Sequence, residues 1–406
     1  MVIEAFALVG IIIILGFIGD YLFKKTSIPD ILILILFGFL LGPIFNIIDP
    51  AVLSPIAPFL ASLALLIILF DAGLNLNLRR VLRESSRAFL LGVLSFLTSM
   101  IFTTFLAYYI WNWSWMYSLL LGAIIGGTSS SVVIPLISRM KLSPRVTTLL
   151  SLESAITDAI VVVVGIAILH VITVSPGGNE LTTIAHSITS AFSIGATFGL
   201  ITGIIWLRIL KNIEHGIYDD IITLSFVLLL FAIVESLGGN GAIFALAFGL
   251  VLGNGREISD MLNIKEPMEA GRMMKKFMSQ ISFFIRTFFF MYLGLMLIIK
   301  NYHLIFYGIL ISVILLFGRL ISSYFASFGD ALLEKNRSIM TIILPRGLAA
   351  AVLSQLIVTS NVSKGYMFSD IIIIVIIITV VISSIGSSII EKGMKSAIDE
   401  KEKTNN

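Results

Sequence analysis

The chain contains no cysteine, four histidines and few charged residues, and each shortage excludes a class of protein. A protein without cysteine has no disulfide, no thiolate metal ligand and no thiol nucleophile. The histidines are dispersed at the ends of apolar segments, which does not suit a catalytic or transition-metal cluster. Charged residues make up 13% of the 406 residues, against about 25% in ordinary globular chains, and the net charge is +3. These values exclude a soluble enzyme and a nucleic-acid-binding protein.

Apolar residues, by contrast, make up 58% of the chain and gather in long runs. A helix needs about 20 apolar residues to cross a membrane, so runs of this length between charged or Pro/Gly/Asn-rich breaks predict transmembrane helices. The pattern predicts an all-α, multi-pass protein of the lipid bilayer with about 13 spans. The predicted spans lie near residues 3–23, 28–47, 53–74, 88–110, 116–138, 147–174, 184–210, 219–237, 240–254, 277–299, 303–328, 338–359 and 368–390.

Lysine and arginine are distributed unevenly between the alternating loops of this topology. Of the 27 basic residues, only Lys300 and Lys364 fall in the loops of one side. Three arginines fall within predicted spans, at positions 286, 319 and 346. Cytoplasmic loops of membrane proteins carry the excess of Lys and Arg. We therefore expect the N-terminus outside, the C-terminus in the cytoplasm, and the protein in the plasma membrane.

The composition predicts one membrane-embedded unit over residues 1–390 and a short charged cytoplasmic tail over residues 391–406. The first six residues carry no Lys or Arg, so the opening apolar run is expected to be a permanent span and not a cleaved signal. The longest connection, Gly255 to Lys276, is expected to form a short amphipathic helix at the cytoplasmic face. All candidate chemistry then lies within the membrane.

Two acidic residues stand close together in the span near 147–174. A charge inside a span costs several kcal/mol, so it needs a partner, a water-filled cavity or a function. At 100° per residue, Ser154 and Asp158 share one helix face, while Glu153 and Thr157 share another. A carboxylate with hydroxyl neighbours is a ligand set for a hard monovalent cation. The alternative is that these acids pair with arginines inside the bundle.

Two spans are interrupted at mid-depth by residues that break helices. The first contains Gly-Gly-Thr-Ser-Ser-Ser over residues 126–131, and the second contains Pro-Arg-Gly over residues 345–347. An unwound helix can line a site with free backbone groups, although the small residues of the first break would also suit close helix packing. The breaks are seven spans apart, and each lies fifth in a half of six spans. This predicts two inverted six-helix repeats with two broken crossing helices, an architecture of secondary transporters.

Two further charges lie nearer the inner ends of their spans. Asp71 precedes Arg79 and Arg80, which suits a solvated helix end as well as a place along an ion route. Arg286 is expected to extend its side chain toward the interface.

Five motifs stand in order along the chain: LFDAGLNL over residues 69–76, ESAITD over 153–158, LGGNG over 237–241 with LGN over 252–254, RTFFF over 286–290, and PRG over 345–347. Together they resemble the sodium/proton exchanger domain of the monovalent cation/proton antiporter superfamily, closest to its electroneutral archaeal and bacterial branch. The resemblance runs over nearly the whole chain. It implies a core of the spans near 88–174 and 303–390 that moves against a dimerisation part near 3–74 and 219–299, with the span near 184–210 as linker. A homodimer is the usual state of the family.

The resemblance also implies which residues hold the ion. Asp158 takes the position of the ion-binding, proton-carrying aspartate, and Ser154 that of a coordinating serine. Thr157 stands where the electroneutral branch has Asn and electrogenic relatives have a second Asp. Many relatives read Thr-Asp-Pro in the first broken span, where this chain has hydroxyl residues similar to those of the potassium-efflux branch. The residues assigned to the ion are Asp158, Ser154, Thr157, Thr128, Ser129 and Ser130.

Four other residues match positions of the family. Asp71 lies where relatives have a Glu near the ion pathway. Glu153 and Arg319 match a structural ion pair behind the site, and Arg346 matches the arginine of the second broken helix.

A single buried carboxylate can exchange ions by competition, because either one proton or one monovalent cation neutralises Asp158. The bare carboxylate would be held back by the cost of moving a charge through a medium of low dielectric. These considerations predict electroneutral one-for-one exchange of H⁺ against Na⁺, with no cofactor. The alternatives are a K⁺/H⁺ antiporter of the same fold and a transport-inactive or ion-sensing membrane protein, which the missing acid of the first break suggests.

Overall fold

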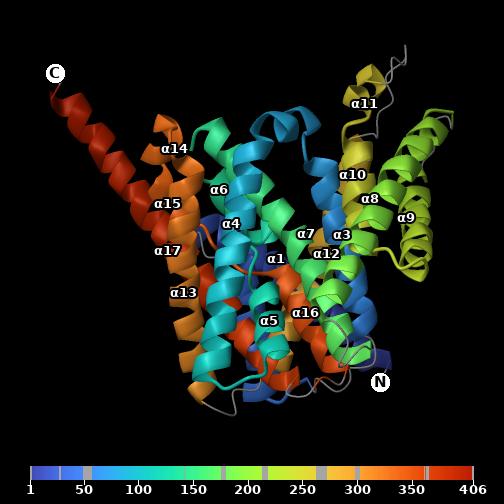
Figure 1. Cartoon of the computed structure of the whole chain (residues 1–406), viewed down its shortest axis with the longest axis horizontal. Coiled ribbons are helices and arrows are strands. Elements are labelled where there is room, and N and C mark those ends of the chain that lie inside the picture. The colour runs from blue at the N-terminus through green and yellow to red at the C-terminus, as the bar shows by residue number, and fades with distance from the viewer. Residues whose placement is uncertain are drawn as a thin grey trace.

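The computed structural model describes residues 2–26, 29–48, 57–140, 142–174, 180–212, 218–261, 272–297, 302–360, 362 and 365–404. Within these residues there are seventeen α-helices, one π-helical turn and no strand. The predicted all-α fold is therefore confirmed. The long helices stand side by side, and the two ends of the chain lie at opposite ends of the molecule (Figure 1).

Each predicted span coincides with one helix or with a pair of shorter helices. The elements are α1 (Val2–Thr26), α2 (Asp30–Phe39), η1 (Leu40–Ile44), α3 (Ala57–Asn75), α4 (Leu78–Ile110), α5 (Trp115–Ile124), α6 (Ser130–Ser138), α7 (Pro144–Val174), α8 (Glu180–Asn212), α9 (Asp219–Ser236), α10 (Gly241–Gly253), α11 (Gly255–Met261), α12 (Arg272–Met296), α13 (Tyr302–Ser327), α14 (Ala331–Lys335), α15 (Arg337–Ile342), α16 (Leu348–Thr359) and α17 (Gly365–Thr404). Six of the described helices are long and apolar enough to cross a membrane, or seven if the bent pair α10 and α11 is counted as one span. The total of thirteen spans stays a prediction.

The connection between Gly255 and Lys276 differs from the sequence-based expectation. Only Gly255–Met261 forms a separate short helix, α11, whereas the residues from Arg272 onward already belong to α12. The expected surface helix between them falls partly on residues 262–271, which lie outside the described residues. Helix α17 continues through the charged tail as far as Thr404. The tail contains a single glycine and no proline, so no strong helix breaker ends the helix after its apolar part.

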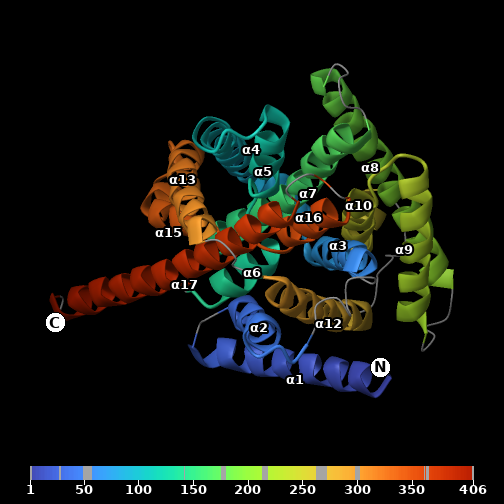
Figure 2. The same ribbon diagram turned by 90° about the horizontal axis from the view of Figure 1, so that it is seen from below.

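The helices pack in two bundles. The crossing bundle comprises α4 to α7 and α13 to α17, in which α13 packs on α4 and α17, and α16 packs on α7 and α17. The flanking bundle comprises α1 to α3 and α9 to α12, in which α3 packs on α10 and α12, and α2 packs on α12. In Figure 2, α4, α5 and α13 lie on one side of the molecule and α9 on the other, with α8 beside α10. The bundles meet where α3 lies against α16, and α8 contacts both α7 and α10.

Glycines allow the backbones of α3 and α10 to approach closely. A Cβ atom added at Gly249 would fall on the carbonyl oxygen of Phe70, and one added at Gly253 would fall on that of Leu74. A Cβ at Gly73 would in turn meet the backbone of α10. Small residues drive such contacts between membrane helices because they permit dense packing. This contact fixes α3, which borders the candidate site described below.

We expect Gly249→Ala to lower the thermal unfolding temperature of the purified protein. An added methyl group in a packed helix contact typically costs about 1–3 kcal/mol. Gly10→Ala in α1 is the matched control, because nothing lies within 4 Å of the Cβ atom that it adds. Equal shifts of the unfolding temperature in the two variants would contradict this account of the α3–α10 contact.

Candidate functional site

The first helix break lies between α5 and α6, which are separated by residues 125–129. Gly126 and Gly127 have the weakest helix propensity apart from proline, and the chain unwinds there. The break also runs close to α7, since a Cβ at Gly127 would meet Thr157 and Val161. The backbone N–H of Thr128 donates to the Thr157 hydroxyl at 3.2 Å, so α7 replaces a lost helical hydrogen bond.

The second break lies between α15 and α16, over residues 343–347. Pro345 has no backbone N–H and therefore cannot continue a helical ladder. Here α17 supplies the missing partners. The N–H of Leu344 donates to the Ser383 hydroxyl at 3.1 Å, and that of Arg346 donates to the Thr379 hydroxyl at 3.0 Å.

The two breaks cross each other inside the bundle. The N–H of Ser129 donates to the carbonyl oxygen of Pro345 at 2.9 Å. Gly347 has to be a glycine at this crossing, because a Cβ there would fall on the Ser129 side chain. Residues more than 200 positions apart in the sequence thus form one mid-depth layer.

Asp158 of α7 points at the start of α6 and is only 7% exposed. Its Oδ2 accepts a hydrogen bond from the backbone N–H of Ser130 at 2.9 Å and another from the Ser130 hydroxyl at 2.6 Å. The N-terminus of a helix offers free N–H groups and a positive dipole end, which stabilise a nearby carboxylate. Asp158 also borders a small cavity together with Ser131 and Leu348.

The other hydroxyl residues assigned to the ion point elsewhere. The Thr128 hydroxyl donates to Glu153 Oε1 at 2.9 Å, and the Thr157 hydroxyl donates to the Thr128 carbonyl at 3.2 Å. The Ser154 hydroxyl donates within its own helix to the Ser151 carbonyl at 3.0 Å. The Ser129 hydroxyl lies 3.0 Å from that of Ser131. Among these predicted ligands, Ser130 is the one that the structure places on the Asp158 carboxylate.

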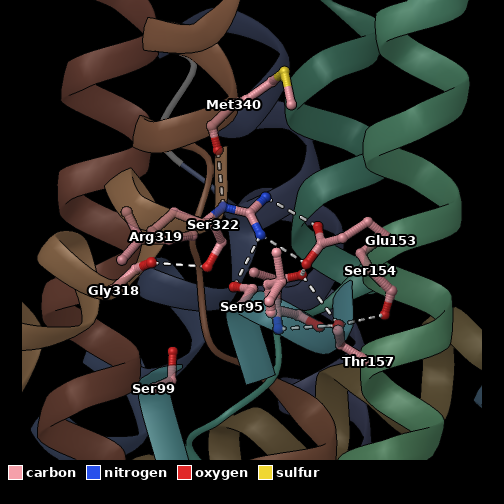
Figure 3. A network of polar contacts seen from close by, with 12 residues as sticks. Ser95, Ser99, Glu153, Ser154, Thr157, Gly318, Arg319, Ser322 and Met340 are labelled. Carbon is pink, nitrogen blue, oxygen red and sulfur yellow. Dashed lines mark hydrogen bonds and ion pairs between the residues drawn. The ribbon is translucent and has the colours of Figure 1, made fainter. Parts of the chain in front are cut away.

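Glu153 and Arg319 face each other from α7 and α13 (Figure 3), and both side chains are fully buried. Arg319 Nη1 lies 2.8 Å from Glu153 Oε1, and Nη2 lies 3.0 Å from Oε2, which is a bidentate ion pair. The remaining donors of the guanidinium reach the Met340 carbonyl at 2.8 Å and the Ser95 hydroxyl at 3.1 Å. The pair therefore connects α4, α7, α13 and α15.

Arg346 lies in the second break and is also fully buried. Its Nη2 donates to the Ser99 hydroxyl at 3.1 Å. Its Nε and Nη1 have no hydrogen-bond partner among the described residues. A positive charge thus sits at the crossing of the breaks with one neutral partner.

A cavity of about 320 Å³ leads from the ends of α3 and α6 to the first break, with Asp71, Ser130 and Ser131 on its wall. Asn75 and Leu76 at the end of α3 also line it, and they lie next to Arg79 and Arg80, so the cavity lies near the side on which Lys and Arg accumulate. Asp71 Oδ1 accepts hydrogen bonds from the Asn75 amide at 3.0 Å and the Ser279 hydroxyl at 3.3 Å.

Apolar side chains surround the small cavity beside Asp158. Leu65 and Leu69 of α3 and Leu348 of α16 line it and are buried. Ser131 borders both this small cavity and the larger one that contains Asp71.

Arg286 does not extend toward the interface, and that expectation was wrong. Its Nη2 forms an ion pair with Asp30 Oδ2 at 3.0 Å, and its Nη1 lies 3.4 Å from the carbonyl oxygen of Ser131. Burial makes a direct partner more favourable than a long reach to water, and α2 supplies that partner. The sequence analysis missed Asp30, although an acid directly after Pro29 within the apolar run 28–47 was an available signal.

The chain matches the family described as "Sodium/hydrogen exchanger, transmembrane" over residues 10–391. The K(+)/H(+) antiporter NhaP2 of Shewanella sp. (strain ANA-3) is 27% identical over 239 residues, which are 57% of this chain and 40% of that protein. The chain thus matches less than half the length of that relative. The Na(+)/H(+) antiporter 1 of Methanocaldococcus jannaschii is 23% identical over 363 residues, which are 86% of this chain and 82% of that protein.

A solved structure shows the same fold. The sodium proton antiporter MjNhaP1 from Methanocaldococcus jannaschii, at pH 8, superposes with a TM-score of 0.81 at 21% identity, covering 96% of this chain and 98% of that chain. The family match extends over most of the sequence, including both helix breaks and the acids of α7. The chain therefore belongs to the sodium/hydrogen exchanger family.

Proposed function

We propose that the protein is a secondary active transporter that exchanges a monovalent cation, preferentially Na⁺, for H⁺ by alternating access. One observation carries this proposal: the buried Asp158 carboxylate lies beside the crossing of two broken helices, and Ser130, which donates to it, borders the cavity of about 320 Å³ that also contains Asp71. Membership of the sodium/hydrogen exchanger family supports it. We favour sodium over potassium because, of the two relatives described above, the one that matches the larger share of both chains is named a Na(+)/H(+) antiporter.

The exchange rests on competition for one charge. Either a proton or a monovalent cation neutralises Asp158, and the two cannot do so together. The loaded site can cross the apolar barrier, while the bare carboxylate is held back by its desolvation cost. No cofactor takes part in this cycle, and no transition metal is needed.

We assign Asp158 and Ser130 to direct contact with the ion. Ser154 lies one helical turn before Asp158 on the same face, and a rotation about its χ1 angle would bring its hydroxyl toward the carboxylate. Ser129 completes the set at the crossing. Carboxylate and hydroxyl oxygens are the ligands that a hard cation prefers.

Three other positions support the site. Thr128 donates its hydroxyl hydrogen bond to Glu153 and its backbone N–H to the Thr157 hydroxyl, and the two hydroxyl groups also lie within hydrogen-bond distance of each other. We therefore assign both threonines to holding the first break against α7. Glu153 and Arg319 serve as a structural ion pair, and Arg346 places a fixed positive charge behind the crossing. Asp71 lines the entrance and serves the ion pathway.

Alternating access requires one bundle to move against the other. In this proposal the crossing bundle is the mobile core, the flanking bundle forms the homodimer, and α8 links them. The open cavity then faces the cytoplasm of a cell whose plasma membrane holds the N-terminus outside and the C-terminus inside. The accumulation of Lys and Arg on the cavity side supports this orientation.

Potassium is the second candidate ion. The hydroxyl of Ser129 stands where an acid would supply a second charge near the ion, and relatives named K(+)/H(+) antiporter match part of the chain. A weaker field at the site favours a larger, more easily dehydrated cation. Proteoliposomes with an internal pH dye, given Na⁺, Li⁺, K⁺ and a neutral osmolyte in turn, distinguish these ions. Absence of cation-dependent proton movement at every pH would contradict the transporter proposal.

Asp158→Asn is expected to abolish cation-driven proton movement in these liposomes. The change removes the charge for which both ions compete and keeps the shape and hydrogen-bonding capacity of the side chain. Asp260→Asn is the matched control, because Asp260 is exposed and pairs with Arg79 at 3.1 Å on the surface. Exchange retained by Asp158→Asn would place the ion site elsewhere.

Glu153→Gln and Arg319→Gln should each lower the free energy of unfolding by about 3–5 kcal/mol, because each strands a buried charge. The double variant removes both charges and should recover part of this loss. The exposed Arg79–Asp260 pair provides the comparison, since surface pairs contribute about 1 kcal/mol or less. Unfolding temperatures of the wild type and these three variants test the coupling, and strictly additive losses in the double variant would contradict it.

Transport is expected to be electroneutral, because Asp158 is the one acid assigned to the ion and Thr157 is uncharged. Each cycle then carries one charge inward and one outward, so the membrane potential does no net work. Moving one charge would otherwise be worth about 2.3 kcal/mol per 100 mV. A potassium–valinomycin potential of either sign should leave equal Na⁺ and H⁺ gradients at equilibrium. A reversal point that shifts with voltage would reveal a second proton carrier.

A further inference from the structure

The wall of the cavity carries a positive charge in the middle of a proposed cation route. Arg286 of α12 lines the same cavity as Asp71 of α3 and Ser130 of α6. Its side chain is 18% exposed, so its guanidinium is in reach of the water and ions that enter. A cation that approaches Asp158 therefore has to pass an arginine.

The position of this guanidinium depends on one ion pair. Nη2 contacts Asp30 Oδ2 at 3.0 Å, whereas Nη1 makes a long contact of 3.4 Å with the Ser131 carbonyl. Nε has no hydrogen-bond partner among the described residues. Asp30 is itself buried at the start of α2 and does not line the cavity that Arg286 borders.

Asp71 and Asp158 could each accept Arg286 as an ion-pair partner. Asp71 receives hydrogen bonds from the neutral groups of Asn75 and Ser279, which leave its charge in place. Among the described residues, the Asp158 carboxylate receives its hydrogen bonds from the backbone and the hydroxyl group of Ser130. A guanidinium released from α2 would be a cation tethered in the cavity that Asp71 and Ser130 border, at a high effective concentration.

We infer that Asp30 is a positioning residue that holds Arg286 against α2 and so prevents its guanidinium from competing with the transported cation. This inference rests on the proposed function. The Asp30–Arg286 pair is neutral as a unit, so Asp71 and Asp158 keep the cavity negative and attractive to cations. Without Asp30, the positive charge of Arg286 is uncompensated and repels the entering ion or occupies its site.

The test is the KM for Na⁺ of Asp30→Asn in proteoliposomes, compared with its maximal rate. The KM should rise roughly tenfold at a nearly unchanged maximal rate, because unit charges interact far more strongly in a poorly hydrated cavity than in bulk water. Asp30→Glu retains the ion pair, and the double variant Asp30→Asn/Arg286→Gln removes both charges. Both should show a KM close to that of the wild type. A purely structural role for Asp30 would lower the unfolding temperature and the maximal rate of Asp30→Asn and leave the KM for Na⁺ unchanged.

Arg286→Lys provides a second test that leaves a charge pair in the core and so preserves folding. Asp30 holds the single ammonium group of a lysine less rigidly than the planar guanidinium of an arginine. The KM for Na⁺ should therefore rise by about threefold. Asp260→Asn, which removes one acid from an exposed pair, is the control with unchanged KM.

The stabilising effect of Na⁺ on the unfolding temperature supplies a readout that does not need transport. The half-saturating Na⁺ concentration should follow the KM in each variant. An unchanged half-saturating concentration in Asp30→Asn, with normal exchange by the wild type, would overturn this inference alone. A wild type that responds to no monovalent cation in either assay would overturn the proposed function together with it.

Discussion

Backbone groups that water cannot reach are the constraint on which this site depends. Each helix break frees N–H and carbonyl groups inside an apolar bundle, where an unsatisfied group costs several kcal/mol. The break of α5 and α6 finds its partners in Pro345 and in the carboxylate of Asp158, and the second break finds them in hydroxyls of α17. The same oxygen of Asp158 that completes the backbone of Ser130 is assigned to the ion. In the proposed function, ion binding and local structure are therefore coupled, since an arriving cation would have to share or replace a hydrogen bond that stabilises α6.

Helix α7 separates two acids that are close in sequence. Glu153 and Asp158 are five residues apart, which places them about 140° apart around the helix axis. One side of α7 is therefore fixed by the Arg319 pair and the threonines of the first break, and the other side meets the cavity. A helix that is fixed on one side can keep the Asp158 carboxylate in position on the other.

The sequence predicted the parts of this arrangement that follow from local composition. Glycines at 126 and 127 and the Pro-Arg-Gly of the second break located both interruptions, because these residues break helices in any context. Composition alone placed three arginines within spans, and the resemblance to the family implied that Arg319 is the partner of Glu153. The pair of Asp30 and Arg286 was not predictable in this way. Their contact depends on how α2 packs against α12, and the sequence places them 256 positions apart. Hydroxyl directions, such as that of Ser154 toward its own helix, follow from rotamers that no pattern encodes.

The isolated position of Arg346 has an electrical consequence. Glu153 and Arg319 cancel, so the buried interior of the crossing bundle carries the charge of Arg346 together with whatever Asp158 holds. In the proposed cycle, a core that moves while either ion neutralises Asp158 would carry the positive charge of Arg346 across part of the membrane field. The two opposite movements cancel over a complete cycle, whichever ion is bound. A single, synchronised half-cycle does not cancel, and a transporter that is silent at steady state would then produce a brief displacement current when its cation is suddenly supplied.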